Sequence, residues 1–284
     1  MPTTTRRNLS RWAALALSIV ICAPTTNAVA NDDAVEWQSI KGDIFGDRKV
    51  VEDLNFIDVT APVQADDGAL VPVTMSIPTH VAKQAKSVTL VIDQNPAPVA
   101  AKFIFGEAAG LAERRITTRV RLEKYSNVRA VVEMADGNLY MNTKFVKAAG
   151  GCAAPNAKDL DKSMAQYGKI KLRWVDQAIT AAKYTKPEYQ SFPMSEAQVM
   201  IKHPNYSGMQ RNPETGEFIP AKIIENFVVS KGDRMIFKME GGISLSENPN
   251  FRFTYEAGGT EPIIVNALDT DGEKFEMKAI REGS

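Results

Sequence analysis

The chain has 284 residues, of which 44% are hydrophobic, and it carries 34 basic and 34 acidic side chains with only two cysteines and two histidines. This length suits one large domain or two small ones. The charge balance provides no basic excess of the kind that marks a surface for nucleic acid or anionic membranes, so we expect neither partner class.

The first thirty residues have the pattern of a secretory signal peptide. Three arginines precede an apolar run at 12–22, and the small residues at 28–30 predict cleavage before Asn31. The apolar run is too short to remain as a membrane span. The adjacent Arg6 and Arg7 are also compatible with twin-arginine export, so the Sec and twin-arginine routes both stay open. We expect the mature protein in the periplasm.

Cleavage leaves one cysteine. Cys22 would be lost with the leader, and the bulky Ile21 before it argues against a lipoprotein anchor. The mature chain then has 31 basic and 34 acidic residues, and Cys152 has no partner in its own chain. In an oxidising compartment, an unpaired cysteine indicates a reactive thiol or an interchain disulfide.

The chain after the leader begins with a helical pattern and continues with strands. Apolar spacing over 31–48 predicts a short helix. From residue 50 the period becomes two, and Asp136-Gly137 predicts a tight hairpin turn. This alternation predicts an antiparallel β-sandwich over 31–152. Its apolar strand positions fall in the ranges 71–77, 88–92, 101–105, 116–122, 128–134 and 139–145.

The alternation of apolar and polar residues stops over 153–194, and this segment is predicted to form a linker. The 160–167 segment has helical spacing of apolar residues, which makes the linker partly helical. Ile170, Leu172 and Trp174 alternate, and either a helix or an extended segment fits them. A linker of forty residues is expected to pack on its neighbours.

Alternation resumes over 195–284, with turns predicted at 212–216, 231–233 and 271–272. The fold class is therefore all-β: two immunoglobulin-like antiparallel β-sandwich domains joined by the linker, with a short N-terminal helix.

The one remaining thiol lies in an unusual local sequence. Gly150 and Gly151 precede Cys152, and Pro155 follows. Because glycine and proline disfavour regular structure, we predict an exposed, mobile loop with the two glycines as a flexible arm. The nearby Lys147 and Lys158 are interpreted as solvated surface charges, not as groups that activate the thiol.

Metal, cofactor and independent catalytic sites are not indicated. His80 and His203 have no ligand-like spacing to each other or to Cys152. We interpret His80 as a turn or surface residue and His203 as a hydrogen-bonded structural residue. No nucleophile, base and orienting acid can be assembled from the pattern, so no enzyme activity and no cofactor are expected.

Two sets of motifs resemble a known pair of proteins. The first half resembles the SoxY subunit of the periplasmic sulfur-oxidation carrier, and the second half resembles SoxZ. The SoxY-like segments are 71–74, 91–98, 103–106, 126–137, 139–141 and Gly150-Gly151-Cys152; the SoxZ-like segments are His203-Pro204, 215–221, 248–249 and 251–253.

The resemblance implies a fused SoxYZ-like carrier of the kind associated with quinoprotein dehydrogenases. It implies that Cys152 holds a sulfur-containing intermediate covalently, as in thiosulfate oxidation. Partner redox enzymes, either sulfur-oxidation enzymes or a quinoprotein dehydrogenase with its cytochrome c, would then act on that intermediate. Two departures limit this role: Ala153-Ala154-Pro155 replaces the family's trailing glycines, and the arm is tethered at both ends.

An alternative is a non-catalytic binding or assembly subunit of a periplasmic dehydrogenase. Cys152 would then be vestigial or would link two chains through a disulfide.

Overall fold

The structure is a computed structural model that describes residues 1, 3, 28–156, 166–175 and 193–281. The predicted leader lies mostly outside these residues. Helix α1 (Ala28–Phe45) begins within it, so the predicted cleavage point before Asn31 falls in the first turn of α1. No described helix is both long and apolar enough to cross a membrane.

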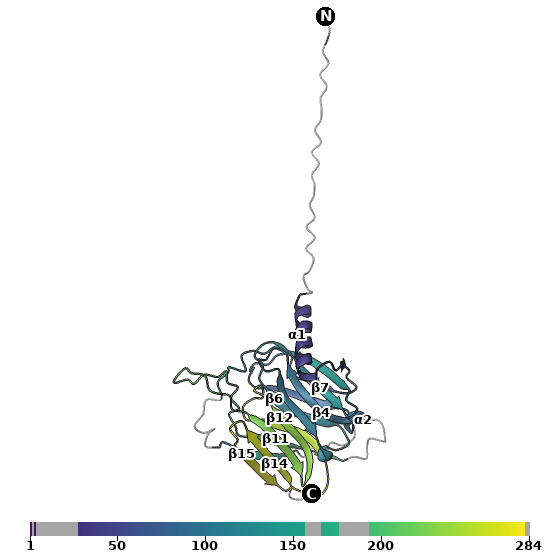
Figure 1. Ribbon diagram of the computed structural model, residues 1–284, viewed down its shortest axis with the longest axis vertical. Coiled ribbons are helices and arrows are strands. Elements are labelled where there is room, and N and C mark those ends of the chain that lie inside the picture. The colour runs from purple at the N-terminus through teal and green to yellow at the C-terminus, as the bar shows by residue number, and fades with distance from the viewer. Residues whose placement is uncertain (2, 4–27, 157–165, 176–192, 282–284) are drawn as a thin grey trace.

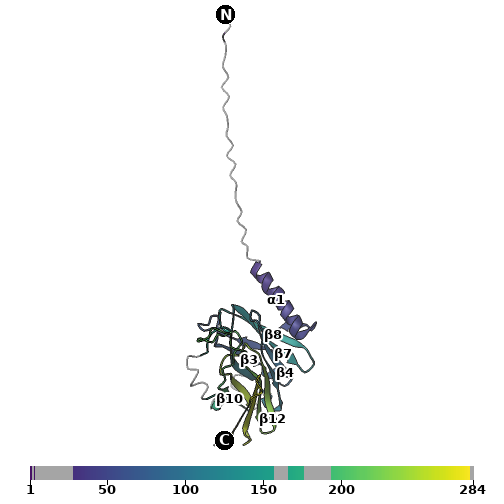
Figure 2. The ribbon, with the colours of Figure 1, turned by 60° about the vertical axis from the view of Figure 1, so that its left-hand side comes forward.

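Two sheets packed face to face make up the body of the molecule (Figures 1 and 2). The larger sheet has the strand order β1 (Val50–Glu52), β8 (Leu139–Val146), β7 (Ser126–Met134), β4 (Ala85–Ile92), β5 (Val99–Phe105), β12 (Arg234–Gly241), β11 (Ile224–Lys231), β14 (Ile263–Asp269) and β15 (Lys274–Ala279). The smaller sheet has the order β2 (Asp58–Thr60), β3 (Val71–Ile77), β6 (Arg114–Val120), β13 (Asn250–Glu256), β10 (Met194–Ile201) and β9 (Ile170–Val175). Every paired strand is antiparallel except β1 on β8. The predicted all-β sandwich is confirmed.

The two halves of the chain share both sheets. Strand β5 pairs with β12 through Phe103↔Met239 and its neighbours, and β6 pairs with β13 at Ile116↔Phe253. The inward-facing residues of both halves therefore form one continuous core. Edge-to-face aromatic contacts cross the junction, with ring centroids 5.8 Å apart for Phe103–Phe237 and for Phe103–Phe251.

The predicted linker contains a strand. Ile170, Leu172 and Trp174 belong to β9, which pairs along its whole length with β10, so the extended alternative is the correct one. The helical spacing predicted at 160–164 lies outside the described residues. Tyr167 lies in the turn before β9.

The C-terminal half of helix α1 packs on the larger sheet near β7 and β8, and its N-terminal half projects away from the body (Figure 2). Trp37 and Ile40 are buried against Val91, Val131 and other side chains of β4, β7 and β8. The Arg129 guanidinium lies 4.3 Å from the Trp37 ring centroid and pairs with Asp93 at 2.8 Å. A short helix α2 (Thr79–Ala82) and a 3₁₀ turn (Glu107–Ala109) complete the regular elements of the described chain.

Candidate functional site

Cys152 lies at one end of the sandwich, in a segment that we call the carrier loop (residues 147–156). This loop leaves β8 and meets the β2–β3 and β6–β7 loops of its own half. It also meets the β10–β11 loop of the second half, since the Ser207 hydroxyl donates a hydrogen bond to the Cys152 carbonyl at 2.5 Å. The thiol therefore lies where the two halves of the chain come together.

The predicted exposed position of the thiol is wrong: Cys152 is buried, with 0% of its surface accessible. Three consecutive backbone amides hold the loop down. Gly150 and Gly151 donate to the carbonyls of Glu123 and Leu122, both at 2.9 Å, and Cys152 donates to the Glu123 carboxylate at 3.0 Å. In this structure the glycines allow close packing and are not a free arm.

Gly151 shows why the position requires glycine. A Cβ atom added there would lie 2.0 Å from the Gly68 carbonyl oxygen and 2.9 Å from the Ala69 nitrogen, closer than any side chain tolerates. The Gly68 carbonyl in turn accepts the Leu122 amide at 2.8 Å. The carrier loop is thus packed backbone against backbone on the first half of the molecule.

The second half holds the same loop from the other side. The Asn156 amide donates to the Pro204 carbonyl at 2.7 Å, three residues before the Ser207 contact. Ser207 is itself positioned by Gln210, whose side-chain oxygen accepts the Ser207 amide at 2.8 Å. Opening the loop must therefore break hydrogen bonds to both halves.

The environment of the thiol keeps it protonated. Burial raises the pKa of Cys152 to about 12, and the nearby Glu123 carboxylate adds to the increase through its charge and a hydrogen bond. The Arg121 guanidinium opposes this change but does not overcome it. Because the thiolate is the nucleophilic form, this environment disfavours the reactive state of Cys152.

Arg121 is the residue that sequence reasoning missed. A charged residue between Val120 and Leu122 in an alternating run is typical of an outward-facing position, yet Arg121 is only 1% exposed because strand β6 has already ended at Val120. Its guanidinium donates to the carbonyls of Asn205 and Leu245 at 2.9 and 2.6 Å, and to Asn156 at 3.2 Å. The pattern offered no signal for this, since all three acceptors are distant in sequence or lie in loops.

Of the two nearby lysines, the structure describes only Lys147. Lys147 is exposed, as expected for a solvated charge, and the interactions that shift the Cys152 pKa involve Arg121 and Glu123. Lys158 lies outside the described residues.

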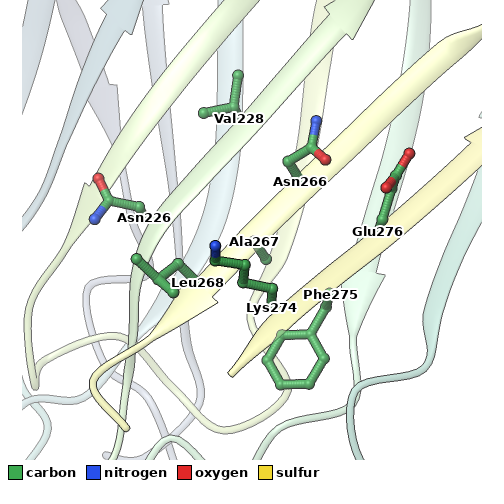
Figure 3. A pocket seen from close by; sticks show the side chains of 8 residues that line it. All are labelled: Asn226, Val228, Asn266, Ala267, Leu268, Lys274, Phe275 and Glu276. Atoms are coloured by element: carbon green, nitrogen blue, oxygen red, sulfur yellow. The ribbon is translucent and has the colours of Figure 1, made fainter. Parts of the chain in front are cut away.

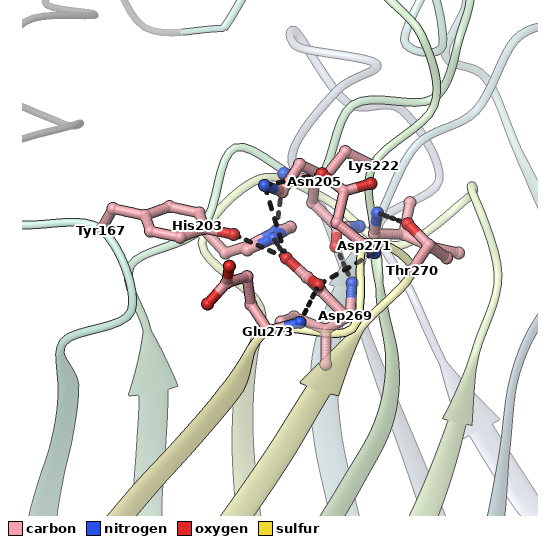
Figure 4. Close-up of polar contacts among 10 residues, drawn as sticks. Tyr167, His203, Asn205, Lys222, Asp269, Thr270, Asp271 and Glu273 are labelled. Atoms are coloured by element: carbon pink, nitrogen blue, oxygen red, sulfur yellow. Dashed lines mark hydrogen bonds and ion pairs between the residues drawn. The ribbon is translucent and has the colours of Figure 1, made fainter.

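A second polar cluster surrounds His203 (Figure 4). Asp269 accepts the Tyr167 hydroxyl at 2.6 Å and lies 3.4 Å from His203 Nε2, while His203 Nδ1 accepts the Asn205 amide at 3.0 Å. Burial lowers the pKa of His203 to about 4 despite Asp269. The predicted structural role of His203 is therefore confirmed, and Asn205 connects this cluster to Arg121.

The Asp269 carboxylate remains ionised inside the cluster. Burial alone would raise its pKa, but hydrogen bonds from Tyr167, the Glu273 amide and His203, together with the Lys222 charge, produce a net lowering. Burial and the same carboxylate raise the pKa of Tyr167 to about 12. These groups tie the turn before β9 to the ends of β10 and β14.

The remaining features carry no comparable chemistry. His80 is exposed, as predicted, and lies in α2. Within the described ranges, no three acidic, histidine or cysteine side chains come together as metal ligands. A hollow of about 340 Å³ on the outer face of β11, β14 and β15 has Lys274 and Glu276 on its walls but contains no cysteine, serine or histidine (Figure 3).

Comparison with known proteins identifies both halves. The family model described as "Sulfur oxidation protein SoxY" matches residues 41–152, and that described as "Sulphur oxidation protein SoxZ" matches residues 186–279. No curated protein matches the chain. Among solved structures, the chain is similar to the sulfur carrier protein SoxY from Chlorobium limicola f thiosulfatophilum. The two are 27% identical, with a TM-score of 0.33 over 40% of this chain and 96% of the other. The chain thus carries a SoxY domain followed by a SoxZ domain, and it belongs to the SoxY and SoxZ families as a fused SoxYZ-like protein.

Proposed function

We propose that this protein is a carrier in which Cys152 holds a sulfur-containing intermediate covalently while partner redox enzymes act on it. One observation carries the proposal: the SoxY match ends on Cys152, the only cysteine outside the predicted leader. The position of the thiol between the two halves supports the same role, since both domains contribute hydrogen bonds to its loop.

The closed loop is the resting state of this carrier. A thiol with a pKa of about 12 does not react with adventitious oxidants or disulfides at neutral pH. Loading therefore begins with opening of the loop, which moves Cys152 into water and returns its pKa toward the ordinary range. A partner that binds the open loop shifts this equilibrium in proportion to its preference for the open state.

Loading forms one bond and releases two electrons. The Cys152 sulfur joins a sulfur atom of the cargo anion, the thiol proton leaves to water, and both electrons pass to the electron-accepting cofactor of a partner redox enzyme. In this proposal the carrier supplies the thiol and its tether, and the partner enzyme supplies the redox group. Sulfur-oxidation enzymes, or a quinoprotein dehydrogenase with its cytochrome c, are the proposed partners.

The periplasm is the proposed location, on the strength of the leader pattern in residues 1–30. An oxidising compartment suits a carrier whose lone thiol is enclosed between uses. The tether restricts the reach of the arm, since six extended residues from Lys147 to Cys152 span at most about 20 Å. Partners must therefore approach the Cys152 end of the sandwich.

The test is the intact mass of protein purified from its native periplasm. A mass increase that disappears on reduction and is absent from the Cys152→Ser variant supports the carrier. An unmodified thiol under conditions that induce the partner enzymes, together with an unchanged host phenotype for Cys152→Ser, contradicts it.

A second candidate is a non-covalent assembly subunit, and burial of the thiol is the observation that favours it. Co-purification with a dehydrogenase that survives Cys152→Ala, without any adduct on the wild-type protein, would establish this alternative. A reducible doubled band on non-reducing electrophoresis would instead show a Cys152-linked dimer.

A further inference from the structure

The outer face of the smaller sheet is rich in basic side chains. In β6, β13, β10 and β9 every second residue packs in or against the core, so the residues between them face outward. We call the basic residues among them the cationic face: Arg115, Arg119, Lys171, Arg173 and Arg252.

The strand register places these side chains in one patch. Arg252 lies opposite Thr117 of β6 and opposite Gln198 of β10. Gln198 in turn lies opposite Arg173 of β9. Because neighbouring strands are about 4.8 Å apart, β6 and β9 are separated by about 14 Å. The cationic face therefore extends without interruption across four strands.

Carboxylates compensate only part of this charge. Glu196 pairs with Arg252 and has a side chain that is 3% exposed. Glu256 faces outward at the far end of β13, where an arginine of β12 engages it at 2.7 Å. Glu113, just before β6, pairs with Arg115 at 2.9 Å. Each of these carboxylates is thus already engaged by an arginine.

The other three cations have no carboxylate partner in the described part of the chain. Arg119 donates to the Asn248 carbonyl at 3.3 Å, and Arg173 donates to the side-chain oxygen of Gln198 at 2.6 Å. Both Arg173 and Lys171 are exposed on the edge strand β9. The cationic face therefore keeps a net positive charge.

The larger sheet shows no such separation of charge on its outer face away from α1. Lys102 lies opposite Glu240, and Glu276 lies between Lys274 and Lys278 on β15. Basic and acidic side chains therefore alternate there. The excess of cations belongs to the smaller sheet, on a mature chain that has three more acidic than basic residues.

We propose that the cationic face docks a partner redox protein through a carboxylate-rich surface of that partner. This inference rests on the proposed carrier function and names the chemistry of its partner. Arginine suits the contact, because its planar guanidinium can donate two parallel hydrogen bonds to one carboxylate. The outward side chains of β6, β13, β10 and β9 include no aromatic ring, so the face is poorly suited to entering a bilayer or stacking on nucleic-acid bases.

The size of the face suits a transient contact. Its outermost backbone positions span about 14 by 13 Å, which corresponds to the low end of interface sizes, where weak redox encounters occur. A carrier must release each partner after a transfer, so a contact of this kind is sufficient. Complementary charge speeds the encounter and orients the partner. One end of the face, at Arg119, lies three residues before Leu122, whose carbonyl accepts the Gly151 amide of the carrier loop.

Photocrosslinking in the native periplasm tests this proposal. The full-length chain carries p-benzoylphenylalanine in place of Gln198, at the centre of the cationic face. In the matched control it replaces Asn266, on the outer face of the larger sheet (Figure 3). After irradiation, mass spectrometry identifies the captured molecule and the peptide that was in contact. We expect the Gln198 position to capture a redox protein through a peptide rich in Asp and Glu, and the Asn266 position to capture none of it.

Two double variants test the role of charge. Lys171→Gln with Arg173→Gln removes two exposed cations from the edge strand β9 and should lower the yield of capture about fivefold. Lys274→Gln with Lys278→Gln removes the same charge from the edge strand β15 and should leave the yield unchanged.

Equal capture from the Gln198 and Asn266 positions overturns the proposal, and this comparison does not depend on the double variants. An equal loss in both double variants also overturns it, as does capture of a second copy of this chain, of nucleic acid or of lipid at Gln198. An adduct on Cys152 without capture at Gln198 leaves the carrier function standing and removes the docking surface. Capture without any adduct retains the surface and contradicts the carrier function.

Discussion

Substituting Gly151 by alanine should open the carrier loop. The added Cβ would lie 2.0 Å from the Gly68 oxygen, about 1.4 Å inside ordinary contact, so one backbone segment must move. Movement of the loop breaks the Gly151–Leu122 and Cys152–Glu123 hydrogen bonds and exposes the thiol. The two hydrogen bonds and the burial of the thiol each contribute about 1 kcal/mol. The closed state therefore loses about 3 kcal/mol relative to the open state.

A change of this size shifts the open fraction about 100-fold. The assay is the rate of iodoacetamide labelling of Cys152 at pH 8, followed by intact mass, with urea unfolding to confirm that the fold persists. Gly150→Ala is the matched control, because its Cβ would meet nothing within 4 Å although its φ of +72° costs about 1–2 kcal/mol. Labelling of Gly151→Ala at the wild-type rate, or equal acceleration by Gly150→Ala, would refute the reasoning.

Three further predictions concern the polar contacts. Ser207→Ala removes the hydrogen bond to the Cys152 carbonyl, so it should speed labelling about fivefold and lower the free energy of unfolding by about 1 kcal/mol; an unchanged rate would show that the Ser207 hydrogen bond does not hold the loop closed. Glu123→Gln keeps an acceptor but removes the charge, so the labelling-versus-pH curve should inflect below the wild-type pKa of about 12; an unshifted curve contradicts the assigned cause. For His203, whose folded pKa of about 4 lies below the ordinary 6.5, stability should be complete above pH 6.5 and fall by about 3 kcal/mol as pH drops to 4. Urea midpoints at pH 7 and 4 measure this fall, which His80→Gln should retain and His203→Asn should reduce.

Continuity of the sheets has a consequence for how the two domains work. Because β5 pairs with β12 and β6 with β13, the SoxY and SoxZ halves cannot separate without exposing the shared aromatic core. Movement during loading is therefore expected in the loops at the Cys152 end, where hydrogen bonds replace core packing, and not in the junction itself.

The sequence by itself determined the parts of this protein that depend on local periodicity and short motifs. Alternation of apolar residues specified the strands, because side chains of a strand point to opposite faces. It also specified the sandwich class, and the motifs ending at Cys152 identified the family. The spacing of Ile170, Leu172 and Trp174 could not distinguish a strand from a helix, because so short a run fits both. Pairing with β10 decides for the strand.

Only the tertiary structure decided the state of the thiol. Gly150-Gly151 was interpreted as a flexible arm, since glycine is compatible with mobility and with close packing alike. Burial of the Cys152 thiol depends on Gly68, Leu122 and Glu123 in loops of the same half, and on Ser207 more than fifty residues later. A local sequence pattern cannot show that these residues contact the carrier loop. Arg121 was missed for the same reason. Two of its three acceptors are backbone carbonyls of the second half, and every residue type offers the same backbone carbonyl, so a sequence pattern cannot identify them.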